Sequence, residues 1–147
     1  MQPGGGSHQV FSAKGDVDDG AGHALVTAYA LKRPDGQWSL MIVNRDQQNA
    51  HQVRIAFHNQ ATQEASSFDG PVDIAIFGSK QYQWHAAKTR SAGHAENPGE
   101  WPVIAYSPGS ADPDGPVAHS RQTAGKATSF DLPAASVIVI KGKIAKQ

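Results

Sequence analysis

The sequence predicts an all-β protein: an antiparallel β-sandwich of Greek-key or immunoglobulin-like type, with about eight or nine strands. Two observations lead to this fold class. Short apolar runs alternate with polar or small residues at a period of two, as in 53–57, which is the pattern of a half-buried strand. Fifteen glycines and nine prolines mark turns, and no segment shows sustained helical periodicity. A closed barrel is the structural alternative.

The segment 24–57 predicts a meander of three antiparallel strands, which we place at 25–31, 38–43 and 52–57. Pro34-Asp35-Gly36 forms the first turn, because proline presets φ and glycine accepts a positive φ. The polar residues 44–49 form the second connection.

The strand at 38–43 is apolar on both of its faces. Leu40 and Ile42 share one face with Trp38, whereas Met41 and Val43 lie on the other. We therefore expect this strand in a central position between two layers, with Trp38 in the core.

The remaining strands follow in chain order. Val10 and Phe11 predict a short edge strand, and the acidic residues 16–20 predict a solvated turn, since their spacing does not match a calcium-binding EF-hand loop. Further strands are expected at 72–78, at 81–85 after a bulge or bend at Gly78, and at 117–123, 128–132 and 136–141.

The domain organisation follows from these strands. We expect a linker at 1–8, one β-sandwich domain over 9–143 and a frayed tail at 144–147. Residues 86–115 are rich in proline and glycine and exceed the usual length of a loop, so we expect a contact surface there.

The composition excludes several classes of partner and site. A formal net charge of zero leaves no basic footprint for nucleic acid or an anionic membrane. The absence of cysteine excludes disulfides and thiolate metal sites, and we expect no cofactor. No apolar run reaches the length of a spanning helix, and the first residues lack the basic start and apolar core of a signal peptide.

The chain resembles a known family in four motifs: YALKRPDGQWSLMIVNRD, VDIAIFGSKQYQWH, DPDGP and FDLPAASVIVIKG. Together they look like the C-terminal β-sandwich accessory domain of glycoside hydrolases, nearest to family 39-like enzymes of the retaining (β/α)8-barrel clan. The resemblance covers 9–143. It implies a non-catalytic domain that packs against and stabilises a catalytic barrel, which this chain is too short to contain.

The resemblance also implies a role in carbohydrate metabolism and a secreted or periplasmic location as part of a parent enzyme. Both glutamates of the glycosidase reaction belong to the barrel, so no catalytic residue is carried over and the chain alone is not expected to be an enzyme. Two alternatives stay open. One is a carbohydrate-binding module that stacks exposed aromatic rings on a polysaccharide or oligosaccharide, and the other is an immunoglobulin-like interaction domain.

Aromatic residues in or beside the long irregular segment are the candidate contacts. They are Tyr82, Trp84, His85, Trp101 and Tyr106. Three interpretations are open for them: burial in the core, contact with the barrel, or stacking on a sugar.

Metal and catalytic motifs are weak in this sequence. Asp112 and Asp114 flank Pro113 and are weak candidates for a calcium site, although a tight acidic turn is the simpler account of them. The seven histidines show no metal-ligand spacing, and no nucleophile-elbow motif supports a catalytic triad.

Overall fold

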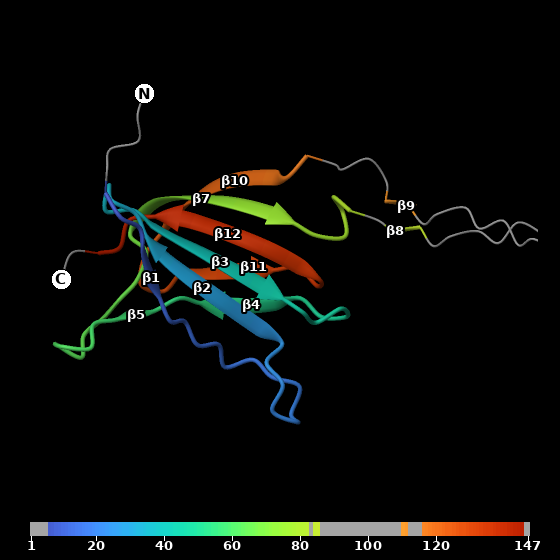
Figure 1. Cartoon of the computed structure of the whole chain (residues 1–147), viewed down its shortest axis with the longest axis horizontal. Coiled ribbons are helices and arrows are strands. Elements are labelled where there is room, and N and C mark those ends of the chain that lie inside the picture. The colour runs from blue at the N-terminus through green and yellow to red at the C-terminus, as the bar shows by residue number, and fades with distance from the viewer. Residues whose placement is uncertain (1–5, 83, 86–109, 112–115, 146–147) are drawn as a thin grey trace, which may run out of the picture. The chain divides into compact units, whose positions relative to one another are not determined.

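A computed structural model of the chain describes residues 6–82, 84–85, 110–111 and 116–145 (Figure 1). These residues form antiparallel sheets, and no helix occurs among them, which confirms the all-β class. Accordingly, the described part of the chain contains no helix long and apolar enough to cross a membrane. The chain divides into two compact units. The first comprises Met1–Ser79 and Val117–Gln147, and the second is Lys80–Pro116.

A six-stranded sheet dominates the first unit. Its strand order is β1-β2-β3-β12-β7-β10, and every neighbouring pair is antiparallel. The bounds of these strands are β1 Gln9–Phe11, β2 Val26–Lys32, β3 Trp38–Asn44, β12 Ser136–Gly142, β7 Gly70–Phe77 and β10 Ala118–Ala124. Each strand lies within two residues of a strand expected from the sequence, and β1 lies at an edge as predicted.

The predicted position of the third meander strand is wrong. Residues 52–57 do not continue the sheet beside β3. Instead β4 (His51–Arg54) pairs with β11 (Ser129–Leu132) in a separate sheet, and β12 occupies the place beside β3. The apolar strand β12 pairs with β3 along the whole length of β3 and also pairs with β7. Strand β4 has four residues and is too short to pair in this way.

A corner built around Asn44 turns the chain from one sheet to the other. The Asn44 side chain is only 2% exposed, and its Nδ2 donates to the carbonyl oxygens of Asn49, Leu132 and Pro133 at 3.1, 3.3 and 2.9 Å. Its Oδ1 accepts the N–H of Asp46. A single buried amide thus ties the end of β3 to the end of β11.

The core lies on one face of the six-stranded sheet. Its buried side chains come from both sheets and from Phe68, and they are Val26, Ala30, Leu40, Ile42, Val72, Ile74, Ala124, Phe130, Leu132, Ile138 and Ile140. Two sheets packed on one core are consistent with a β-sandwich.

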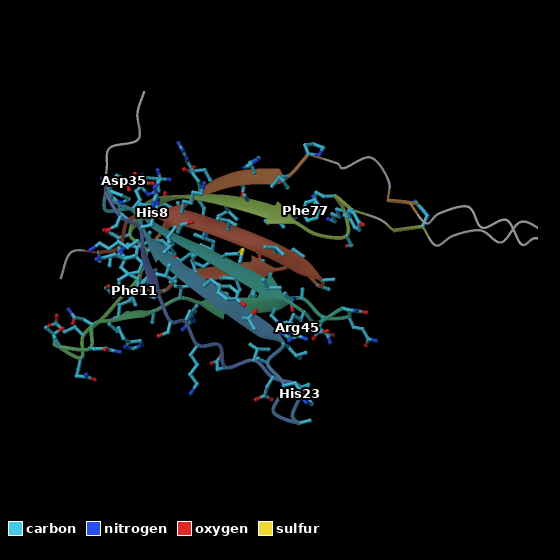
Figure 2. All side chains as sticks on the ribbon, viewed as in Figure 1. His8, Phe11, His23, Asp35, Arg45 and Phe77 are labelled. Carbon is cyan, nitrogen blue, oxygen red and sulfur yellow. The ribbon has the colours of Figure 1, made fainter. Side chains whose placement is uncertain are left out.

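A series of ring contacts crosses this core. Phe11, labelled on edge strand β1 in Figure 2, lies 4.8 Å from Trp38 between ring centroids. Phe57 follows at 5.0 Å from Trp38, and Phe68 at 5.1 Å from Phe57. Trp38 therefore packs against the core as expected.

The chain remains attached beyond β12. Gly142 packs so closely that an added Cβ would lie 2.6 Å from Val72 Cγ1 and 3.1 Å from Phe68 Cδ1. Ile144 forms an isolated bridge with Phe68, and Ala145 N donates to Ser67 O at 3.0 Å. Ile144 and Ala145, which the sequence places in a frayed tail, are thus attached to the segment around Phe68 by backbone pairing.

Several strands have only two residues. In the first unit β5 (Phe57–His58) pairs with β6 (Ala65–Ser66), and in the second unit β8 (Trp84–His85) pairs with β9 (Ser110–Ala111). With them the described residues hold twelve strands, more than the eight or nine that hydrophobic alternation alone indicates. The strand expected at 81–85 is confined to β8.

Candidate docking surface

The face of the six-stranded sheet opposite the core carries a second set of apolar side chains. We call it the outward face. In β3 the buried Leu40 and Ile42 alternate with the exposed Met41 and half-buried Val43, and in β12 the buried Ile138 alternates with half-buried neighbours. The outward positions are 10 in β1, 27, 29 and 31 in β2, 39, 41 and 43 in β3, 137, 139 and 141 in β12, 71, 73, 75 and 77 in β7, and 119, 121 and 123 in β10.

The middle row of the outward face is apolar across four strands. Tyr29 lies opposite Met41, Met41 opposite Val139, and Val139 opposite Ala75. Tyr29 is 57% exposed and Met41 is 39% exposed, although both lie on interior strands of the sheet. An apolar face of a sheet is usually covered by another layer along its interior strands. The exposure of side chains as large as Tyr29 and Met41 is therefore unusual.

The next row continues the apolar character. Val43, Val137 and Phe77 lie side by side on β3, β12 and β7, and each is half-buried. Phe77 is labelled at the end of β7 in Figure 2.

In the described part of the chain, no second sheet is stacked on the outward face. Strands β4 and β11 instead supply Val53, Phe130 and Leu132 to the core on the opposite side. The expectation that β3 lies centrally is confirmed within its sheet, but among the described residues only one of its faces is covered by a layer.

The third row is charged. Ser39 lies opposite Lys141, Lys141 opposite Asp73, and Asp73 opposite Arg121. Arg121 Nε donates to Asp73 Oδ1 at 2.6 Å, and this hydrogen bond, with the attraction of both cations, lowers the pKa of Asp73. The outward face is therefore apolar over two rows and charged along one end.

The size of the outward face suits the centre of a contact surface. Strands about 4.8 Å apart and outward residues about 6.8 Å apart along a strand give the two apolar rows on four strands an area of roughly 260 Å². The charged row brings the three rows to roughly 400 Å² in all. A standard interface covers about 800 Å² on each partner, so a polar rim would supply the rest.

The sequence-predicted contacts all belong to the second unit, Lys80–Pro116. Tyr82 is exposed, and His85 is exposed on β8 in the second unit; both have interactions within the chain. Trp84 belongs to the same strand. Trp101, Tyr106, Asp112 and Asp114 lie outside the described residues.

The described residues bring together no metal-binding group of three or more histidine, aspartate or glutamate side chains. Two histidine–aspartate pairs occur among the described side chains, and both belong to turns. Asp19 Oδ2 lies 2.7 Å from His23 Nδ1 in the acidic turn, which lowers the pKa of Asp19. Asp46 Oδ2 lies 2.9 Å from His51 Nε2 beside the corner.

Sequence reasoning missed the outward face as a site. The available signal was the second apolar face of 38–43, repeated by Val137 and Val139 in 136–141. We interpreted it as burial between layers, because a sequence does not state how many layers a sheet receives.

The chain matches no protein-family model, no curated protein and no solved structure. The relation to glycoside hydrolase accessory domains therefore stays a prediction made from the sequence motifs.

Proposed function

We propose that this chain is a non-catalytic accessory domain of the Greek-key β-sandwich type, which docks its outward face on the catalytic barrel of a glycoside hydrolase and stabilises that barrel. The observation that carries the docking is the pair of large exposed side chains, Tyr29 and Met41, at the centre of an apolar sheet face. The glycoside hydrolase part rests on the sequence motifs.

The energetics favour an occupant for this face. Burying apolar surface stabilises by about 25 cal/mol per Å², so an apolar patch of roughly 260 Å² contributes about 6.5 kcal/mol before the costs of association. The outer helices of a (β/α)8 barrel offer a partner surface of suitable kind.

The Greek-key type is supported by the connections. The chain leaves the six-stranded sheet after β3 for β4, leaves it again after β10 for β11, and returns with β12 between β3 and β7. Such crossings between two sheets are typical of Greek-key sandwiches.

A carbohydrate-binding module fits the outward face less well. Sugar sites combine aromatic rings with hydrogen-bonding groups, whereas Tyr29 lies beside Met41 and Met41 beside Val139. The exposed Tyr82 keeps sugar binding testable in the second unit, by titration against a panel of glycans.

The proposal is tested by sequencing the coding DNA on both sides of this segment and expressing any barrel-sized segment as a separate polypeptide. We expect the tagged barrel to retain the chain and to lose it when Met41→Asp is introduced. Absence of a barrel segment, or retention of Met41→Asp at the level of the unaltered chain, would contradict the proposal. Loss of binding in Trp84→Ala alone would move the contact to the segment around β8.

A further inference from the structure

Among the described residues, the charged row of the outward face leaves one cation without an ion pair. Arg121 is bound to Asp73 at 2.6 Å. Lys141 lies on the other side of Asp73 and attracts its carboxylate, but within the described residues it forms no ion pair. Two cations thus share a single anion, and the row carries a net positive charge.

The position of Lys141 exposes it to any partner that covers the apolar rows. It lies on β12, which is flanked by β3 and β7, and it follows Val139 on the same face. A partner that covers Met41 and Val139 therefore also reaches Lys141. Covering an ammonium group without a compensating charge is costly, because the group loses its water.

We infer that the partner surface carries an aspartate or glutamate carboxylate opposite Lys141, next to the apolar patch that covers Met41 and Val139. This inference rests on the proposed docking of the outward face. A carboxylate fits better than a carbonyl oxygen, because it neutralises the excess charge of the row while Arg121 stays bound to Asp73.

The pair would also set the orientation of the complex. The opposite end of the face, at Val43, Val137 and Phe77, is apolar. A partner rotated by 180° would place its carboxylate on that apolar end and leave Lys141 without a carboxylate from the partner. The pair therefore favours one orientation of the complex over the other, as interfacial charges often do.

The test is a calorimetric titration of the barrel polypeptide with the chain at 50 and 500 mM NaCl. Lys141→Glu is compared with Lys126→Glu, the same charge change at an exposed residue in the turn between β10 and β11. We expect Lys141→Glu to bind about tenfold more weakly at low salt, and the difference to shrink at high salt. Lys126→Glu should bind as the unaltered chain does.

Met41→Asp separates this inference from the proposed function. Equal binding of Lys141→Glu and the unaltered chain at low salt, with binding lost in Met41→Asp, overturns the partner carboxylate and leaves the docking in place. Failure of the unaltered chain to bind the barrel overturns both. Thermal unfolding of each variant confirms that it is folded.

Discussion

Tyr29 and Met41 lie directly opposite each other on β2 and β3, and both side chains are exposed on the face that points away from the core. Met41 is followed by Ile42, which is 3% exposed. The chain thus places Met41 on the outward face and the next residue, Ile42, in the core. We therefore expect Met41 to contribute to binding and Ile42 to contribute to stability.

The first prediction uses this alternation. Ile42→Ala should lower the free energy of unfolding by about 3 kcal/mol, because it leaves a cavity in the core. Met41→Ala should lower it by less than about 1 kcal/mol, because no second layer covers Met41 in the described part of the chain. Urea unfolding followed by fluorescence measures both. Equal losses would show that the outward face is covered within the chain.

The second prediction concerns the corner at Asn44. Asn44→Ala removes the buried donor to Asn49, Leu132 and Pro133 and leaves their carbonyl oxygens without this partner. The free energy of unfolding should fall by about 2–3 kcal/mol. Asn59→Ala is the comparison variant, since Asn59 Oδ1 accepts the N–H groups of Ala61 and Thr62 in an exposed turn. A loss no larger than that of the control would mean that Asn44 does not join the two sheets.

The third prediction is a pH dependence at Asp46. The N–H groups of Gln48 and Asn49, with smaller contributions from the Asn49 and His51 side chains, hold the pKa of Asp46 well below its usual range. The folded chain then binds fewer protons than the unfolded chain, so this stabilisation is present above the unfolded pKa of about 3.9 and is lost as pH falls below it.

Asp46→Asn removes this acid-sensitive contribution. Its Tm should be about 5 °C below that of the unaltered chain at pH 6, and the two values should converge towards pH 2. Thermal unfolding from pH 6 to pH 2 measures this, and Asp131→Asn on β11 controls for the loss of one negative charge. A gap between the two proteins that stays constant with pH would argue against the Asp46 turn as its source.

The fourth prediction concerns close packing at Gly142. Gly142→Ala places a methyl group against Val72 and Phe68 in the core, which should cost about 1–3 kcal/mol of unfolding free energy. Gly125→Ala should be close to neutral, because an added Cβ there meets nothing within 4 Å. Similar stabilities of the two variants would show that the core at Gly142 accepts a methyl group.

The sequence predicts the strands better than it predicts their partners. Apolar runs and alternation located β2, β3, β7, β11 and β12, because side-chain burial follows a local pattern, and a mixed pattern located β10. The pairing of β12 with both β3 and β7 depends on contacts far apart in the chain, so local pattern placed 52–57 beside β3 incorrectly. The Asn44 amide shows the same limit, since its partners Leu132 and Pro133 are 88 and 89 residues away.

The candidate site was harder to predict. Aromatic residues such as Trp84 are conspicuous in a sequence, whereas the outward face is built from ordinary residues on separate strands. Met41 and Val139 become neighbours only through the register of β3 and β12. Whether their face is covered depends on the number of layers, which residue types do not encode.

The most direct test of the docking surface is the rate at which hydrogen peroxide oxidises Met41. The chain has two methionines, Met1 and Met41, so Met41 reports on the outward face alone and Met1 serves as the internal reference. Mass spectrometry of proteolytic fragments gives both rates. Docking predicts ready oxidation of Met41 in the isolated chain and roughly tenfold slower oxidation with saturating barrel, with Met1 unchanged. An unchanged Met41 rate in the bound complex would contradict docking through this face.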